Sequence, residues 1–225
     1  MRHTRLVFPS RHFATLVVML CAFPAAILAQ VTAAQKSPEP LAKLVDVGGY
    51  RVHLYCTGAV SPAVVIVGAG YSFDWGPVQP EVAKLTQVCT YDHSGIGWSD
   101  SGPQDSCDLR VDEVHTALKK AGINGPYVLV GHSLGALVSR LEADALTKKH
   151  PQLLGDKPLV NVSTDVRVAD YVKLQADLLR LSKNSKEIVA QNSTHFVIID
   201  RPDVVVDAIK QAVQSIRPHT PLLPM

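Results

Sequence analysis

Apolar and polar positions along this chain follow two different spacings. Short continuous apolar runs, typical of strands buried on both faces, alternate with segments whose apolar residues recur every three or four positions, as in helices. The predicted strands cover residues 44–47, 51–56, 63–67, 88–91, 126–130, 158–162 and 187–190. The predicted helices cover residues 111–121, 134–149, 169–182 and 203–213, and residues 75–86 are predicted to form a Pro-rich approach and a short helix. Strands that alternate with helices predict βαβ units, and therefore an α/β fold with a mostly parallel sheet.

The N-terminal residues follow another pattern. A basic stretch precedes an unbroken apolar run over residues 14–29, and small residues follow it, which is typical of a secretory signal peptide. The run is shorter than the roughly 20 residues of a membrane-spanning helix, and Pro24 interrupts it. We expect cleavage and export to the periplasm or the medium; the alternative is an uncleaved leader that anchors the chain. The expected organisation is a signal peptide at 1–29, a flexible tether at 30–40, one α/β domain at 41–217 and a Pro-rich tail at 218–225.

The charge balance changes once the leader is set aside. The 225 residues include 22 Lys and Arg against 20 Asp and Glu, but three arginines and no acid lie before residue 30, which leaves 19 basic and 20 acidic residues. Nucleic-acid binding requires a concentrated basic surface, so this composition argues against it.

The cysteines suggest one disulfide. Without the leader's Cys21, the chain keeps Cys56, Cys89 and Cys107, an odd number for an oxidising compartment. Cys56 ends one predicted strand and Cys89 begins another, so we expect these two to pair and Cys107, in a polar loop, to stay free. Two buried free thiols at positions 56 and 89 are the alternative.

A Gly-His-Ser-Leu-Gly sequence at residues 131–135 directly follows the predicted strand 126–130 and opens the next predicted helix. In that position Gly-x-Ser-x-Gly is typical of a nucleophile elbow, because the glycines permit a turn tight enough to lift the serine hydroxyl above the strand ends. Ser133 is therefore the predicted nucleophile. The alternative is a chance occurrence in a glycine-containing loop.

A serine nucleophile needs a base within hydrogen-bond reach. Three histidines follow the elbow, His150, His195 and His219. His195 comes after the predicted strand 187–190, in a small polar loop at the carboxyl edge of the sheet, where ligands meet parallel sheets. We therefore predict His195 as the base, with a packed structural histidine as the alternative, and we expect the other two on the surface.

Acyl transfer also needs two donors for the oxyanion. The first predicted donor is the backbone amide of Leu134, directly after the serine. The second is expected from Gly70 or Tyr71, in the turn after the strand 63–67. The alternative is an ordinary turn at the end of the strand. Such a turn would present the same amides, so it is compatible with a role in binding the oxyanion.

Four segments resemble the α/β-hydrolase superfamily, in its exported bacterial members related to proline iminopeptidases, haloalkane dehalogenases and esterases: GHSLG, TYDHSGIGWSD, AGINGPYVLVGHSLGALVSR and STHFVIIDRPDVVVDAI. The resemblance covers about residues 45–140 and 158–213. It implies the α/β-hydrolase fold, the serine and histidine roles given above, and a substrate pocket near Trp75 and His132. His93 stands where the family usually has an arginine that supports the fold. We therefore expect this histidine to lower the stability of the fold and not the catalytic activity.

One interval departs from that family. Between Arg140 and Pro158 the superfamily normally has a further strand, an acid-bearing loop and a helical lid, whereas this chain runs into the next predicted core strand. We expect a reduced fold that lacks one strand and the lid.

The third member of the triad is consequently harder to assign. The superfamily order is serine, acid, histidine. Glu142 and Asp144 lie on the predicted elbow helix and Asp156 at the wrong end of a strand, whereas Asp165 follows that strand at the carboxyl edge. We predict Asp165 as the acid, with a helix N-cap as its alternative role and Asp170 as the reserve.

These residues predict a serine hydrolase that cleaves ester or amide bonds of a small substrate through an acyl-enzyme. The alternative is a truncated, catalytically impaired homologue that acts as a binding or vestigial protein. The histidines are scattered and the chain has no Cys-x-x-Cys or phosphate-binding loop, so we expect no metal and no cofactor. The expected partner is the substrate alone, with no nucleic acid and no membrane contact except through an uncleaved leader.

Overall fold

The computed structural model describes residues 41–68, 70–103, 106–133, 135–136, 154–165, 169–217 and 222. The chain divides into residues 1–39 and residues 40–225, and the second unit carries every described element. The predicted signal peptide, the whole of the predicted tether and the predicted elbow helix after Ala136 lie outside the described residues. Within the described part of the chain, no helix is long and apolar enough to cross a membrane.

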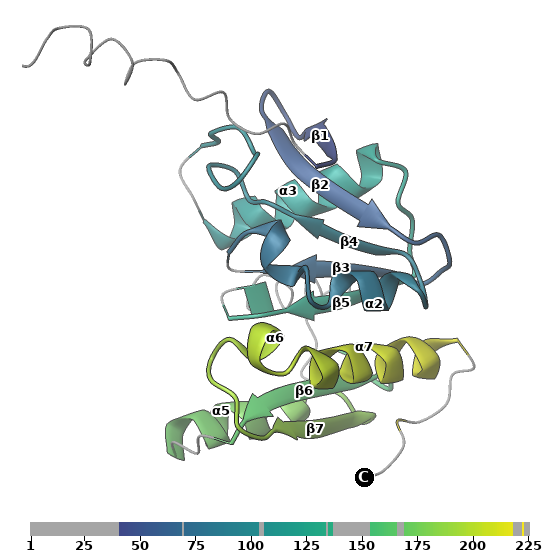
Figure 1. The fold of residues 1–225 in the computed structure, drawn as a ribbon, viewed down its shortest axis with the longest axis vertical. Helices are drawn as coiled ribbons and strands as arrows, with labels where there is room; N and C mark the ends of the chain where they lie inside the picture. The colour runs from purple at the N-terminus through teal and green to yellow at the C-terminus, as the bar shows by residue number, and fades with distance from the viewer. Residues whose placement is uncertain are drawn as a thin grey trace, which may run out of the picture. The chain divides into compact units, whose positions relative to one another are not determined.

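The main sheet has five strands in the order β1-β2-β4-β3-β5 (Figure 1). Their bounds are β1 Lys43–Asp46, β2 Arg51–Thr57, β3 Ala63–Val67, β4 Val88–Tyr91 and β5 Tyr127–Gly131. β2 is antiparallel to both β1 and β4, whereas β3 is parallel to both β4 and β5. Every residue of β3 is buried, as its continuous apolar run predicts for a central strand. The carboxyl ends of β3, β4 and β5 therefore meet at one edge of the sheet.

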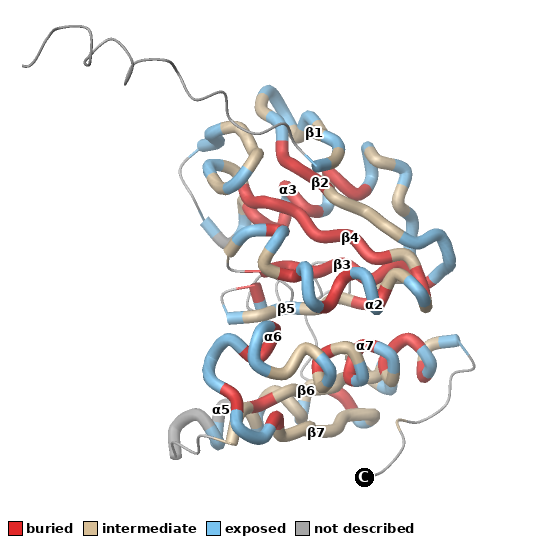
Figure 2. The backbone as a smooth tube through the Cα atoms, in the orientation of Figure 1, coloured by how far each residue is buried: buried red, intermediate tan, exposed pale blue. Residues whose placement is uncertain are grey.

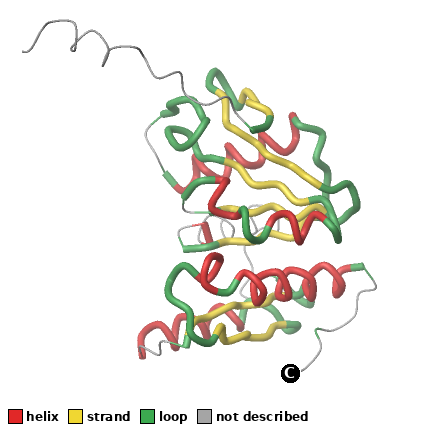
Figure 3. The backbone as a smooth tube through the Cα atoms, in the orientation of Figure 1, coloured by secondary structure: helices red, strands yellow, loops and turns green. Residues whose placement is uncertain are grey.

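A second, two-stranded sheet joins β6 Leu159–Thr164 to β7 Ser185–Ala190 in parallel. No ladder links β5 to β6 among the described residues. Most of the interval from Arg140 to Pro158, where we expect one strand and the lid to be lacking, lies outside the described residues. Helix α7, Pro202–Ile216, contacts β5, β6 and β7. One helix therefore packs against both sheets (Figures 1 and 3).

Two apolar clusters fill the two faces of the main sheet, and β3 and β4 between them are buried along their whole length (Figure 2). One face of β3, with Val65 and Val67, packs against helix α3, Cys107–Lys120. The opposite face, with Val64 and Ile66, packs against α2, Gln79–Ala83, and against α7. The alternation of side chains along β3 thus builds a helix layer on each side of the sheet, as the pattern predicts.

The other described helices are η1 Ser72–Trp75, α5 Ala169–Leu179 and α6 Val197–Asp200. The short helix predicted after a Pro-rich approach within residues 75–86 is α2, and the Gly76-Pro77 pair separates it from η1, which was not predicted. Helix α3 begins earlier than predicted because Ser106 caps it: Leu109 N–H donates to Ser106 Oγ at 3.1 Å. The short helix α6 was not predicted.

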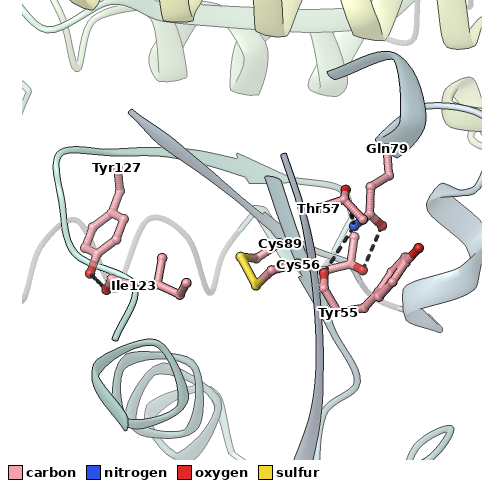
Figure 4. Close-up of a disulfide and its surroundings, with 8 residues drawn as sticks. Tyr55, Cys56, Thr57, Gln79, Cys89, Ile123 and Tyr127 are labelled. Carbon is pink, nitrogen blue, oxygen red and sulfur yellow. Dashed lines mark hydrogen bonds between the residues drawn. A yellow bond between two sulfur atoms is a disulfide. The ribbon is translucent and has the colours of Figure 1, made fainter. Parts of the chain in front are cut away.

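The predicted disulfide is present. Cys56 and Cys89 lie opposite each other in the β2–β4 ladder, with Cα atoms 4.1 Å apart, and their sulfurs are bonded (Figure 4). Gln79 Nε2 donates beside them to Tyr55 O, at 3.1 Å. The covalent link and this buried amide join β2, β4 and α2. The side chain of Cys107 lies outside the described atoms.

Candidate active site

Ser133 has the backbone conformation that a nucleophile elbow requires. Its φ angle is +56°, in the left-handed region that non-glycine residues rarely adopt, and its side chain is exposed. It lies in a turn directly after β5, at the carboxyl edge of the main sheet. Ala136 N–H donates to Ser133 O at 3.0 Å, which closes the turn on its far side.

Both glycines of the elbow are sterically required. A Cβ atom at Gly131 would lie 2.7 Å from Ala136 N, and one at Gly135 would lie 2.6 Å from the carbonyl carbon of Val67. His132 N–H donates to Val67 O at 3.2 Å, which fixes the elbow against β3. The Gly-x-Ser-x-Gly pattern is therefore explained by close backbone packing at this turn, as predicted.

His195 lies in the loop between β7 and α6, residues 191–196, which we call the histidine loop. The loop is anchored at its start: Arg201 Nη1 donates to Gln191 O at 3.0 Å, and Asn192 N–H donates to Asp165 Oδ2 at 2.9 Å. Asn192 has a φ angle of +57°, which asparagine tolerates. These bonds set the direction in which the chain leaves β7.

The centre of the loop is anchored by Asp200. Thr194 donates to Asp200 Oδ2 twice, from its amide at 2.7 Å and from its hydroxyl at 2.6 Å. The Thr194 hydroxyl bond and then the amide bond lower the pKa of Asp200 below its ordinary value, because both favour the charged carboxylate. Sequence reasoning missed Asp200 and Arg201 as anchors; the only signal was their position just after the predicted base.

The elbow and the histidine loop meet through two imidazole rings. His132 Nε2 lies 2.8 Å from the carbonyl oxygen of His195, and the two ring centroids are 4.9 Å apart at an interplanar angle of 41°. The buried indole of Trp75 meets the His132 ring edge-on, with centroids 6.3 Å apart. The structure thus brings together three residues that the sequence assigned to the pocket or to the base.

The predicted triad is only partly assembled. Among the described residues, no hydrogen bond joins Ser133 to His195 or His195 to Asp165. The Asp165 carboxylate accepts the Asn192 amide instead, three residues before the histidine. Catalytic hydrogen bonds are often long in ligand-free structures, so the assignment of Asp165 stays a prediction. The side chain of the reserve acid, Asp170, lies outside the described atoms.

The predicted oxyanion turn contains a competing carboxylate. Tyr71 N–H donates to Asp74 Oδ2 at 2.9 Å, as part of the cap of η1. A Cβ atom at Gly70 would lie 2.5 Å from the same oxygen, so this carboxylate also lies close to Gly70. The Tyr71 amide is therefore engaged within the protein. The other predicted donor, Leu134, lies outside the described residues.

A buried carboxylate fixes that turn from below. Asp92, at the end of β4, accepts the Ser72 amide on Oδ1 at 2.6 Å and the Trp98 amide on Oδ2 at 3.2 Å. His53 Nδ1 lies 3.1 Å from Oδ2, and neither side chain is exposed. Burial raises the pKa of Asp92, but the bonds from His53, Ser72 and Trp98 outweigh it and hold the pKa below its ordinary value. The sequence did not predict this pair, because His53 is simply one position in a predicted strand.

His93 makes a second link to the same turn. It is buried, and its Nε2 donates to Gly68 O at 2.9 Å, while its ring meets Tyr91 edge-on at 4.7 Å. The histidine that replaces the family's arginine thus ties the end of β4 to the end of β3. Its expected cost in stability remains a prediction.

The described residues contain no group of three or more His, Cys, Asp or Glu side chains placed to hold a metal ion.

Comparison with known proteins places these features in context. A model of the alpha/beta hydrolase family matches residues 63–169. An uncharacterized protein of Schizosaccharomyces pombe is 40% identical over 75 residues, but this chain spans only 14% of its length. The uncharacterized protein YqjL of Bacillus subtilis is 25% identical, with 74% of this chain and 90% of that protein covered. The 2-hydroxymuconate semialdehyde hydrolase of Pseudomonas sp. strain CF600 is 32% identical over 128 residues, covering 54% of this chain and 43% of the enzyme.

Solved structures extend the likeness at low identity. A putative lipase from Acinetobacter baumannii AYE superimposes with a TM-score of 0.67 at 13% identity, over 79% of this chain and 92% of the lipase. The enol-lactonase from Burkholderia xenovorans LB400 gives a TM-score of 0.64 at 12% identity, over 76% of this chain and all of the lactonase. At such identities the comparison concerns the fold.

Proposed function

We propose that this chain, which has the α/β-hydrolase fold and matches the alpha/beta hydrolase family model over residues 63–169, is a serine hydrolase acting on an ester or amide of a small substrate. Ser133 is the nucleophile and His195 the base in this proposal. The 2-hydroxymuconate semialdehyde hydrolase among its relatives supports hydrolysis as the class of reaction.

The proposed reaction has two halves. His195 takes the proton of Ser133 Oγ while the oxygen attacks the substrate carbonyl carbon, and the backbone amides of Leu134 and of the Gly70–Tyr71 turn bind the oxyanion. His195 then gives the proton to the leaving alcohol or amine, and an acyl-enzyme remains. Water, deprotonated by His195, attacks that ester, and collapse of the second tetrahedral intermediate releases the acid and restores Ser133.

The observation that carries this proposal is the conformation of the elbow. Ser133 is an exposed residue and holds a positive φ angle, close to two glycines, Gly131 and Gly135, whose positions leave no room for side chains. Such strain persists only where the surrounding structure enforces it, and it is typical of functional sites. His195 lies in the loop that is hydrogen-bonded to this same elbow.

Asp165 is the proposed third member of the triad. It lies directly after β6, at the carboxyl edge of the smaller sheet, and its hydrogen bond to Asn192 joins it to the histidine loop. In this role the carboxylate would hold the imidazole in the correct tautomer and stabilise its charged form.

A fluorophosphonate probe tests the proposal directly, because it reacts with activated serines. We expect covalent labelling of the wild-type protein at Ser133, located by peptide mass spectrometry, and no labelling of Ser133→Ala. Ser101→Ala removes an exposed serine in another loop and should label like wild type. A folded wild-type protein that takes no label, beside a control hydrolase that does, would sink the proposal.

A second candidate function is a catalytically impaired homologue that retains the fold for binding. Two observations favour it: the Tyr71 amide is donated to Asp74, and Ser133 and His195 share no hydrogen bond among the described residues. A series of p-nitrophenyl esters separates the candidates. An active enzyme without a lid should hydrolyse the acetate better than long-chain esters, whereas an impaired homologue should hydrolyse none faster than Ser133→Ala does.

We also propose that the protein is exported and acts in the periplasm or the medium. The disulfide supports this, because such bonds form and persist in oxidising compartments. N-terminal sequencing of the protein recovered from the cell exterior should give a mature start after residue 29, whereas an intact leader on membrane-bound material would favour the anchored alternative.

A further inference from the structure

The histidine that precedes the nucleophile has a specific polar contact. A carbonyl oxygen can only accept a hydrogen bond, so His132 Nε2 must carry the proton that it shares with His195 O over 2.8 Å. Both the neutral Nε2–H tautomer and the imidazolium satisfy this requirement. The contact therefore does not depend on one protonation state of His132.

The position of this bond in the fold is informative. The other anchors of the histidine loop come from the end of β6 or from the segment that follows the loop, namely Asp165, Asp200 and Arg201. Among the described residues, the His132 bond is the hydrogen bond that joins the loop to the elbow. It connects the residue next to the nucleophile with the backbone of the base.

The bond also restricts the base itself. The carbonyl group of His195 is attached to the Cα atom from which the imidazole extends, so fixing the carbonyl fixes the origin of that side chain. The rotation left to the His195 ring is limited by two neighbouring rings, His132 and Phe196, whose centroids lie 4.9 Å and 5.6 Å from its own. Trp75, buried below, supports the His132 ring edge-on.

We infer that His132 is a positioning residue, which holds the histidine loop so that the His195 imidazole stays within reach of Ser133. This inference rests on the proposed function, since it assigns His195 as the base. His132 itself takes no proton from the substrate and forms no bond with it. Its contribution is orientation, and small displacements of a catalytic group cost large factors in rate.

Two variants and a matched control test the inference. His132→Gln keeps a donor at about the position of Nε2, His132→Leu removes it at similar volume, and His115→Leu removes an exposed histidine on α3, far along the chain from the site. The readouts are kcat and KM for p-nitrophenyl acetate, and hydrogen exchange of the backbone amides of residues 193–197.

For His132→Leu we expect kcat to fall by about tenfold or more, the equivalent of one lost hydrogen bond, with KM within about twofold. Amide exchange in residues 193–197 should accelerate in the same variant. His132→Gln should recover most of kcat and of the protection, and His115→Leu should match wild type in both. A residue with a merely structural role would lower the melting temperature without this recovery by glutamine.

The exchange measurement separates the two proposals. If the wild-type protein hydrolyses nothing and takes no fluorophosphonate, the proposed function fails, and exchange still decides whether His132 holds the loop. Unchanged exchange and unchanged kcat in His132→Leu would overturn the inference while the proposed function stands. Equal losses of kcat in the Gln and Leu variants would overturn it as well, because the donor would then not be the property that matters.

Discussion

Asp92 and His53 form a fully buried pair, with His53 Nδ1 3.1 Å from Asp92 Oδ2, directly beneath the turn that starts η1. The carboxylate accepts hydrogen bonds from three groups: the His53 side chain on β2, the Ser72 amide and the Trp98 amide. Buried charges are tolerated only with such compensation. The pair therefore stabilises the edge of the sheet at which the candidate site lies.

Replacing Asp92 by asparagine should be strongly destabilising. An amide NH₂ group in place of Oδ2 would face the N–H groups of His53 and Trp98, so two donors would lose their acceptor. We expect a loss of about 3 kcal/mol in the free energy of unfolding, in the range for breaking a buried pair. Urea denaturation measures it. Asp112→Asn, at an exposed position of α3, is the control and should change stability little; a comparably small change in Asp92→Asn would contradict the prediction.

The same carboxylate should make stability fall in acid. The pKa of Asp92 is lower in the folded protein than in the unfolded chain, so its contribution is present above the unfolded value of about 3.9 and is lost as the pH falls through the folded value. We expect the free energy of unfolding to decline below about pH 4 more steeply in wild type than in Asp92→Asn. Urea denaturation curves of both proteins, recorded at about six pH values from about 2.5 to about 6, provide the comparison. Parallel curves for the two proteins would show that another group titrates.

The disulfide should contribute strongly to stability. Cys56 and Cys89 are 33 residues apart, and closing a loop of that length is expected to stabilise the fold by about 3 to 4 kcal/mol in the chain-entropy model. The double variant Cys56→Ala/Cys89→Ala should lose about this amount in chemical denaturation. Thiol titration of the unfolded mature protein should find Cys107 alone before reduction and two more thiols afterwards. All three thiols reacting without reductant would exclude the bond.

Asp165 can be tested by separating its charge from its hydrogen bond. Asp165→Asn keeps an oxygen that can accept the Asn192 amide but removes the negative charge. If Asp165 is the acid of the triad, Asp165→Asn should lower kcat by about a thousandfold or more while the protein stays folded. Asp170→Asn is the comparison variant. Wild-type kcat in Asp165→Asn, together with a large loss in Asp170→Asn, would move the acid to the reserve position.

The parts of the fold that could be predicted are those encoded by local pattern. The continuous run of β3 identifies a central strand, and the Gly-x-Ser-x-Gly sequence after β5 identifies the elbow, because each glycine there meets a specific steric need. The disulfide was predictable from the ends of two strands. The α/β-hydrolase fold is confirmed.

The contacts that could not be predicted are long-range and involve single side chains. Nothing local indicates that His53 lies against Asp92, that Asp165 accepts the Asn192 amide, or that His132 bonds to the carbonyl oxygen of His195. Each depends on where an element ends and which way a side chain turns in three dimensions. Local periodicity carries no such information, so the anchors of the site became visible only in the structure.

The packing of α7 against both sheets has a consequence for how the protein is made. The proposed base and this helix belong to the same C-terminal stretch, His195 and then Pro202–Ile216, whereas the proposed nucleophile, Ser133, lies more than 60 residues earlier. During synthesis from the N-terminus, the elbow at residues 131–135 is made before the proposed base, His195. Of the described helices, α7 emerges last, and it packs against both sheets. A chain that ends before residue 195 would therefore carry Ser133 without its proposed base and without the helix that packs against both sheets.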